Sequence, residues 1–386
     1  MAVNIWFFAY PAPLVDGGRE IPIGSVADAS TAFLVTLLFE GKAYMVFAFL
    51  FGLSFTWQWA SAERAGESVV AWSLRRFLVL AVLGVIHGLL LFVGDILLAY
   101  AVLGALLLGL RRLSTRAALL LAALLYLVTV VLMAGAAGAE MLHEPSGGGA
   151  DGSGRAGGLG GMGSDSEDGG LAGYLAAQWR DYPAVAASVL FGQGPLVLAG
   201  FLIGLVVGRS GILPRILARE VPMTRLLGLM TVGLGLGLGL SAAAAMRQLM
   251  SADSDVGVSG GADPLVTTLI LAAGPLQATG YVLAGLLLLR AATAAPVVRA
   301  VAPAGRMSLT NYLTQSLVLA LVFSRVGLDL GGGFGSALPA WVVGLLALML
   351  WSGQVVFSLL WMRVFSTGPV EGLVRAVTYR RRPAWR

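Results

Sequence analysis

Residues 73–112 have the sequence SLRRFLVLAVLGVIHGLLLFVGDILLAYAVLGALLLGLRR, in which two long apolar runs lie between pairs of arginines. Each run approaches the roughly 20 apolar residues that an α-helix needs to cross a bilayer. Backbone groups in hydrocarbon must form hydrogen bonds within the spanning structure, and these runs lack the alternation of barrel strands. The stretch therefore predicts two membrane-spanning helices joined by a short turn.

The whole chain has the same character. Of its 386 residues, 58% are hydrophobic and only 12% are charged, and the mean hydropathy is +0.87. This composition predicts a single integral-membrane domain over residues 1–386, an all-α, polytopic transmembrane helical bundle. A short apolar segment from Val3 to Tyr10 is too short to span. About nine spans are expected, near residues 30–59, 73–93, 95–112, 116–139, 185–208, 224–246, 264–290, 307–325 and 337–362.

The turns between these segments fall into two chemical classes. One class is rich in arginine, as at residues 64–76, 111–116, 209–225, 290–306 and 363–386, and the other is acidic. With nine spans the two classes alternate, so the positive-inside rule places residues 13–28 outside and the basic C-terminal tail, 363–386, in the cytoplasm of a bacterial-type inner membrane. The net charge of +5 follows from these turns, and we expect no nucleic-acid partner.

Other patterns limit the possible chemistry. Residues 143–172 are dominated by Gly, Ser and acidic side chains, which predicts a flexible external loop. The chain has no cysteine, so disulfides and Cys-based metal sites are excluded. No phosphate-binding loop, dinucleotide fingerprint, His-based metal motif or serine-nucleophile elbow occurs, and no metal is predicted.

Two Gly-Pro pairs, at Gly194-Pro195 and Gly274-Pro275, lie 80 residues apart in similar surroundings. A proline inside a span removes a backbone hydrogen bond. One interpretation is a repeat of two functionally broken helices, as in many transporters. The alternative is two ordinary kinks with small residues for close packing, which Gly200, Gly204 and Gly208 also favour.

Four ionisable residues within or beside spans are candidate site residues, because such groups are costly in a membrane. Glu40 and Lys42 lie on the first span, His87 on the second, and Asp95 at the turn into the third. All four fall in the outer half of the membrane and could converge. The alternatives are a buried ion pair for Glu40 and Lys42, a helix cap for Asp95, and an interhelical hydrogen bond for His87 instead of proton transfer.

A second polar group is predicted nearer the cytoplasm. It consists of Gln277, Thr279 and Tyr281 on the seventh span, and of Arg306, Asn311 and Gln315 on the eighth. Asn311 and Gln315 share one helix face. Uncharged amides in spans either join helices or bind ligands, and both interpretations stay open.

Four motifs are spread along the chain: Phe39-Glu40-Gly41-Lys42 with Phe49-Leu50-Phe51-Gly52, His87 with Gly94-Asp95-Ile96-Leu97 and Tyr100, Gly305-Arg306-Met307-Ser308-Leu309-Thr310-Asn311-Tyr312, and Gly368-Pro369-Val370-Glu371 with Arg375. In these motifs the chain resembles the YeiB-like family of bacterial inner-membrane proteins, whose C-terminal half is known as domain of unknown function 418. Family members usually begin with a complete first helix that carries an Asp and an Arg-Gly pair, of which only the end, Asn4 to Pro11, is expected here.

More distantly, the chain resembles transmembrane acyltransferases typified by heparan-alpha-glucosaminide N-acetyltransferase. That resemblance implies an acyl-CoA donor in the cytoplasm and a small-molecule or lipid-linked acceptor beyond the membrane. His87 would be the general base, Asp95 or Glu40 would orient it, and Lys42 would stabilise oxyanion charge. The donor would lie near a set of basic side chains: Arg75, Arg76, Arg111 and Arg306.

An acyltransferase is thus the first functional hypothesis. A transporter of a small amphiphile and a non-catalytic membrane scaffold are the alternatives. Membrane lipid is an expected partner in every case, and a homo-oligomer is compatible with all three.

Overall fold

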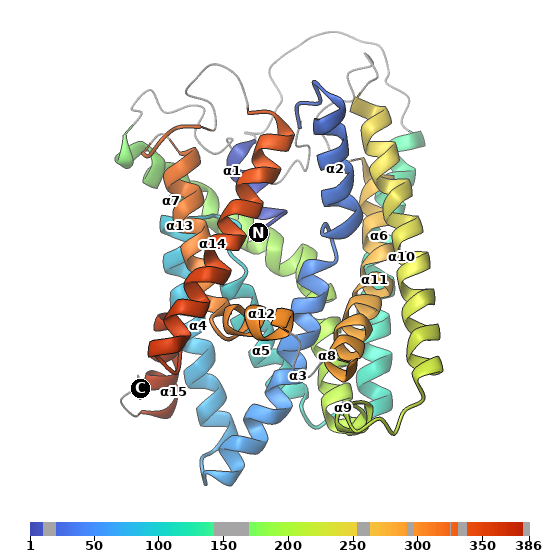
Figure 1. The fold of residues 1–386 in the computed structure, drawn as a ribbon, viewed down its shortest axis with the longest axis vertical. Helices are drawn as coiled ribbons and strands as arrows, with labels where there is room; N and C mark the ends of the chain where they lie inside the picture. Colours follow the sequence, from blue (N-terminus) through green and yellow to red (C-terminus); the bar gives the residue numbers. More distant parts are fainter. Residues whose placement is uncertain are drawn as a thin grey trace.

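The computed structural model describes residues 1–10, 21–142, 170–252, 263–291, 296–324, 326–330 and 338–380. These residues form helices and no strand, which confirms the predicted all-α fold (Figure 1). The helices, with one π-helical segment η1, are α1 Asn4–Ala9, α2 Val26–Leu38, α3 Ala43–Arg64, α4 Val69–Leu90, α5 Leu97–Leu110, α6 Thr115–Leu142, α7 Leu171–Ser188, η1 Val189–Gln193, α8 Gly194–Ser210, α9 Ile212–Leu217, α10 Met223–Ala252, α11 Pro264–Ala291, α12 Pro296–Arg306, α13 Ser308–Phe323, α14 Ala340–Val364 and α15 Pro369–Tyr379.

Seven segments of the described chain are long and apolar enough to cross a membrane: Val26–Arg64, Val69–Leu90, Thr115–Gly135, Leu171–Ser210, Met223–Ser251, Pro264–Arg290 and Ala340–Val364. The two remaining predicted spans correspond to α5 and α13, which have only 14 and 16 residues. At 1.5 Å per residue, α5 is about 21 Å long, shorter than the hydrocarbon core of about 30 Å. Each predicted span contains a helix, but only seven segments of the described chain are long enough to be candidate membrane spans. The predicted count of nine is therefore not confirmed.

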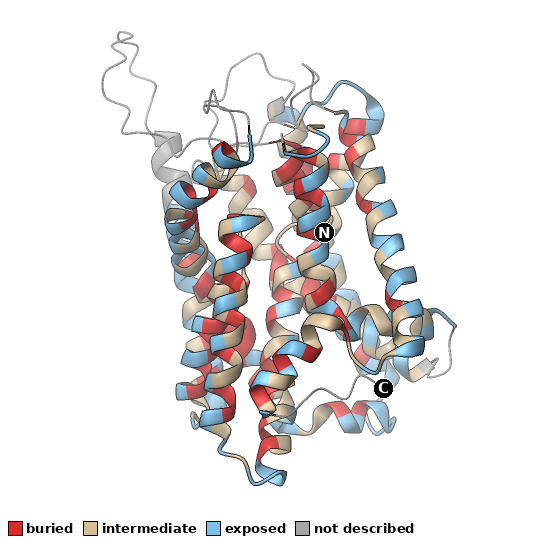
Figure 2. Ribbon diagram, turned by 90° about the vertical axis from the view of Figure 1, so that its left-hand side faces the viewer, coloured by how far each residue is buried: buried red, intermediate tan, exposed pale blue. Residues whose placement is uncertain are grey.

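The outer surface of the bundle is apolar. On α6, Leu120, Leu124, Leu127 and Leu132 are each more than half exposed. Figure 2 shows exposed residues along the outer faces of the long helices and buried residues toward the interior. An apolar surface of this extent is unfavourable in water and favourable in lipid, so the bundle is that of a membrane protein.

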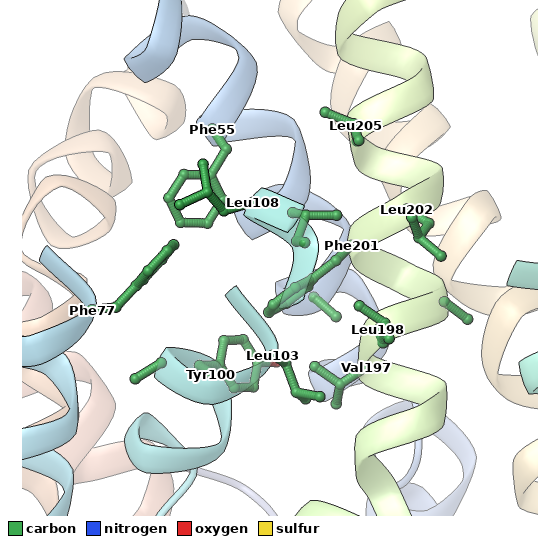
Figure 3. Packing of buried hydrophobic residues seen from close by; sticks show 14 of the residues in the cluster. Phe55, Phe77, Tyr100, Leu103, Leu108, Val197, Leu198, Phe201, Leu202 and Leu205 are labelled. Atoms are coloured by element: carbon green, nitrogen blue, oxygen red, sulfur yellow. The ribbon is translucent and has the colours of Figure 1, made fainter. Parts of the chain in front are cut away.

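The largest core cluster joins α3, α4, α5 and α8. In it, the ring of Phe51 stacks on Phe201 with centroids 4.8 Å apart, and Phe55 meets Phe77 edge-on at 5.3 Å. Figure 3 shows Phe55, Phe77 and Tyr100 facing Phe201 and the leucines of α8. This core fixes the position of the α4–α5 hairpin.

Glycines allow the closest helix contacts, as their spacing predicted. A Cβ at Gly200 would lie 2.8 Å from the Cβ of Ala48, so α8 approaches α3 without room for a side chain. Gly233 and Gly237 of α10 have the same role, because a Cβ at either would lie 2.8 Å from the backbone of α11. In lipid there is no hydrophobic driving force between helices, and small residues allow the close van der Waals packing that holds the helices together instead.

The arginine-rich turns meet at one end of the bundle. Arg209 donates to the carbonyl of Leu113, and Arg219 donates to that of Arg290, each at 3.2 Å. Figure 1 shows α9 and α15 at the same end. The sequence predicted this segregation of charge.

The two Gly-Pro pairs differ in structure. Gly194-Pro195 begins α8 directly after η1, whereas α11 continues without interruption through Pro275. The described helices therefore do not form a repeat of two broken spans. The interruption of a long apolar segment lies instead between α2 and α3, at residues 39–42.

Two predicted segments have limited coverage. Of the predicted loop 143–172, only residues 170–172 lie within the described residues. The predicted tail 363–386 contains the end of α14 and helix α15, which packs on α4 and α13.

Candidate functional site

The α4–α5 turn brings His87 and Asp95 together. Helix α4 ends where the amides of Leu91 and Phe92 both donate to the carbonyl of His87, at 2.8 and 3.0 Å. Asp95 Oδ2 then accepts a hydrogen bond from the amide of Leu98, 2.9 Å away, in the first turn of α5. This is the capping role predicted for Asp95, and it fixes the carboxylate at the start of the helix.

The other oxygen of the same carboxylate binds the histidine. Asp95 Oδ1 lies 2.9 Å from His87 Nδ1, and the two residues are 2% and 1% exposed. A carboxylate accepts the proton of Nδ1, which assigns the lone pair of the neutral ring to Nε2. Nε2 is buried and has no hydrogen-bond partner among the described residues. Asp95 therefore acts both as a cap and as the partner of His87.

Tyr312 of α13 is a third member of this site. Its hydroxyl lies 3.3 Å from Asp95 Oδ1, to which it donates, and 3.4 Å from the amide of Ile96, from which it accepts. Its ring centroid is 4.9 Å from that of His87. Tyr312 ends the motif that begins at Gly305 but is not among the site residues predicted from the sequence. The available signal is a polar aromatic group within a span.

Aromatic side chains surround the pair. Phe92 stacks on Phe8 of α1 with centroids 4.9 Å apart. Tyr174 of α7 donates to the carbonyl of Leu91 at 2.8 Å, and the ring of Tyr182 packs against Gly88. Because α1 and α7 cover the turn, His87 and Asp95 interact in an environment of low dielectric constant, where their attraction is strong.

Glu40 and Lys42 lie in the interruption between α2 and α3. Gly41 has φ +76°, a left-handed conformation that favours glycine and lets the chain leave α2. Lys42 is the only lysine in the chain and is fully buried, and its Nζ donates to the carbonyl of Thr36 at 2.6 Å. Glu40 accepts from the hydroxyl of Thr36 at 2.8 Å.

The Glu40–Lys42 ion pair, one of the two alternatives for these residues, is not among the described salt bridges, and both side chains bind Thr36. Lys42 places its positive charge at the C-terminal end of α2, where the helix dipole is negative.

Gln277 of α11 also binds the C-terminal end of α2. Its amide nitrogen donates to the carbonyl of Leu37 at 2.8 Å, and its oxygen accepts from Ser241 at 2.9 Å. Tyr281 donates to the carbonyl of Leu38 at 2.9 Å. Three consecutive carbonyls left free by the interruption thus bind side chains from α11 and Lys42. For Gln277 the contacts agree with the interhelical interpretation.

The four ionisable candidates consequently form two clusters. Among the described hydrogen bonds none joins Glu40 or Lys42 to His87 or Asp95.

The other predicted residues are dispersed. Asn311 binds the carbonyl of Ala304 and the hydroxyl of Ser358, at 3.2 and 3.1 Å, and so joins α12, α13 and α14. Arg306 donates to the carbonyl of Ser366 at 2.8 Å. Gln315 is buried on α13, and Arg111 is partly buried at the end of α5. The described hydrogen bonds of Asn311 and Arg306 do not involve His87.

Glu371 has a structural role that sequence reasoning missed. Its Oε1 accepts from the amides of Leu309 and Thr310, at 2.7 and 2.9 Å. The carboxylate of α15 thus caps the first turn of α13, which carries Tyr312. The motif around Glu371 and the motif that ends at Tyr312 meet in this contact.

A metal site has no support in the described residues, which contain no group of three or more His, Asp or Glu able to hold an ion.

Comparisons with known proteins agree with the motifs. Residues 207–381 match the profile of a family described as "Protein of unknown function (DUF418)". The chain is 28% identical to the "uncharacterized protein YxaH" of Bacillus subtilis over 402 residues, which cover 98% of this chain and 90% of that protein. It is 39% identical to the "uncharacterized protein YeiB" of Escherichia coli over 84 residues, 22% of this chain and 20% of that protein. No solved structure matches significantly.

Proposed function

This chain is related to the YeiB-like membrane proteins and carries a DUF418 region, and we propose that it is a membrane-embedded acyltransferase in which His87 is the general base. The observation that supports this proposal is the buried His87–Asp95 pair, with Nδ1 bound at 2.9 Å and Nε2 without a partner among the described residues. A histidine held by a carboxylate on one nitrogen, with the other nitrogen free, is suited to accept a proton at neutral pH.

The proposed reaction transfers an acyl group from a CoA thioester to a hydroxyl or amine. Nε2 of His87 takes the proton of the acceptor while the acceptor oxygen or nitrogen forms a bond to the thioester carbonyl carbon. The C–S bond then breaks, and the thiolate receives the proton from Nε2. Asp95 stays ionised throughout, because it orients the imidazole and stabilises its protonated form.

Glu40 and Lys42 have no part in this step. Their hydrogen bonds to Thr36 stabilise the end of α2 instead of reaching His87. Tyr312 takes the place that was expected for Glu40, because its hydroxyl donates to Asp95 and holds the carboxylate toward the ring.

The orientation in the membrane is part of the proposal. The arginine-rich end faces the cytoplasm of a bacterial inner membrane, where acyl-CoA is available, and the acidic turns face outward. The donor would approach from the end that carries Arg75, Arg76, Arg111 and Arg306.

The test compares His87→Gln with the wild type. Membranes that contain either protein are incubated with acetyl-CoA labelled in the acetyl group, and label in lipid and glycan fractions is measured. Glutamine keeps one hydrogen bond to Asp95, so the thermal unfolding midpoint should change little while transfer falls by about 10²- to 10⁴-fold. His143→Gln, which changes the only other histidine, is the control and should transfer label normally.

Two results would contradict the proposal. One is a His87→Gln protein that transfers label as fast as the wild type. The other is a wild-type membrane that transfers no more label than a membrane without the protein, over acyl chains of several lengths.

A transporter is the second candidate. The observation that favours it is the interruption at residues 39–42, which leaves the carbonyls of Thr36, Leu37 and Leu38 outside the helical pattern within an apolar segment. Interrupted helices of this kind bind substrates and ions in many transporters. Substrate uptake that survives His87→Gln and is lost in Lys42→Met would favour this candidate.

A further inference from the structure

Arg76 and Trp72 lie one helical turn apart on α4, at the arginine-rich end of the bundle. The guanidinium carbon of Arg76 lies 6.0 Å from the ring centroid of Trp72, and the Tyr379 ring of α15 meets Trp72 edge-on at 5.7 Å. Figure 1 shows α15 beside α4 at this end. The three side chains therefore form one small cluster between the two helices.

The cluster presents two buried N–H groups that have no acceptor. Nε of Arg76 and Nε1 of Trp72 are both buried, and neither has a hydrogen-bond partner in the described part of the chain. The Trp72 side chain is only 1% exposed. Buried donors are nearly always paired in folded proteins, so two unpaired donors on neighbouring turns require an explanation.

The adjacent residue, Arg75, finds hydrogen-bond acceptors and a counter-charge for its guanidinium within the protein. Arg75 donates to the carbonyls of Ala71 and Thr378, each at 3.0 Å, and forms an ion pair with Glu67 at 3.1 Å. Arg76 forms no salt bridge with a described carboxylate. Glu371, the acidic residue of α15, is already bound to the first turn of α13.

A negatively charged acceptor would satisfy both the partly buried guanidinium of Arg76 and the unpaired Nε1–H of Trp72. An isolated guanidinium in such surroundings is unfavourable, because burial removes its hydration without supplying a counter-charge. The planar fork of arginine is suited to the oxygens of a phosphate, and charge-assisted hydrogen bonds of this type are strong.

We propose that Arg76 and Trp72, closed on one side by Tyr379, bind a phosphate-type oxyanion. The phosphate of a soluble acyl donor and the headgroup of an anionic lipid share this chemistry. Assignment to the donor rests on the proposed function, whereas the binding site itself does not depend on any step at His87.

The test measures binding without turnover. Coenzyme A and inorganic pyrophosphate are titrated separately into purified full-length protein, and affinity is measured by calorimetry. For the lipid source, the unfolding midpoint is compared in phosphatidylcholine nanodiscs with and without phosphatidylglycerol. Arg76→Gln should weaken binding by about tenfold or more, and Trp72→Phe should weaken it by removing the second donor. Arg112→Gln, which changes an exposed arginine after α5, is the matched control and should bind as the wild type does.

The outcomes separate the sources. Binding of coenzyme A or pyrophosphate that depends on Arg76 supports a soluble phosphate ligand. A stabilisation by phosphatidylglycerol that depends on Arg76, without binding of the soluble probes, supports a lipid headgroup. Equal behaviour of Arg76→Gln and the wild type toward all three probes would overturn the site, as would an equal loss in Arg112→Gln.

A second variant covers the case in which Arg76→Gln does not fold. Arg76→Lys keeps the positive charge but lacks the guanidinium Nε–H, so it should bind more weakly than the wild type. If the Arg76→Lys variant and the Trp72→Phe variant each bind as tightly as the wild type, the two proposed donors do not bind the ligand. Loss of transfer in His87→Gln with intact binding would separate failure of the reaction from failure of this site.

Discussion

Nδ1 of His87 lies 2.9 Å from Oδ1 of Asp95, so two buried residues on either side of the α4–α5 turn share one hydrogen bond. The second oxygen of Asp95 caps α5, which prevents the carboxylate from turning away. The pair is thus positioned by the start of a helix and needs no further loop to form it.

Asp95→Asn should abolish transfer while the protein stays folded. The asparagine oxygen can still cap α5, but its amide group would donate to Nδ1 and so place the ring proton on Nε2. Because Nε2 could then no longer accept a proton, we expect transfer to fall by about 10²- to 10⁴-fold. The measurement is label transfer together with the ¹⁵N chemical shifts of His87. Asp263→Asn, a change at a carboxylate paired with Arg247, is the control. Unchanged transfer in Asp95→Asn would exclude a His87–Asp95 base.

Tyr312→Phe should slow transfer and cost about 1 kcal/mol of unfolding free energy. The change removes the hydroxyl that donates to Asp95 at 3.3 Å and keeps the ring against His87. Tyr126→Phe removes a comparable hydroxyl, which donates to the carbonyl of Leu271 at 2.9 Å and has no described hydrogen bond to His87 or Asp95. It should cost similar stability without slowing transfer. Equal transfer rates for the two variants would reduce Tyr312 to a packing residue.

Lys42→Met should destabilise the fold by about 1–3 kcal/mol, because the carbonyl of Thr36 loses a charged donor in a buried position. Glu40→Gln should cost less, since glutamine still offers an oxygen to the hydroxyl of Thr36. Chemical unfolding in detergent would measure both. An equal effect of the two changes would argue against Lys42 as the group that stabilises the end of α2.

The same residue gives a test of burial. Because Lys42 is the only lysine and is fully buried, an amine-reactive reagent should leave Lys42 of the folded protein unmodified. Peptide mapping after unfolding should then detect modified Lys42. Rapid modification of Lys42 in the folded protein would mean that the segment at residues 39–42 opens to solvent.

Membrane orientation can be tested directly, because the chain has no cysteine. Ser254→Cys, in a predicted outside turn, should react with an impermeant thiol reagent in intact cells. Arg112→Cys, exposed at the arginine-rich end, should react only after lysis. The reverse pattern would invert the proposed topology.

The sequence by itself determined the class of fold. Apolar runs such as residues 73–93 force helices in lipid, and the arginines at residues 75–76 and 111–112 set the alternation of the turns, because both signals are local and follow from transfer free energies. It also selected His87 and Asp95, since an ionisable group in a span is costly wherever the helix packs.

Only the tertiary structure decided which polar groups meet. Glu40 and Lys42 lie at similar predicted depth to His87, yet they bind Thr36 at the end of α2. Tyr312, more than 200 residues from Asp95 in the chain, completes the pair instead. The periodicity and charge of the sequence give the depth of a side chain in the membrane but do not say which helix packs beside it. In lipid the neighbouring helix is determined by close packing, here at glycines such as Gly84 and Gly88.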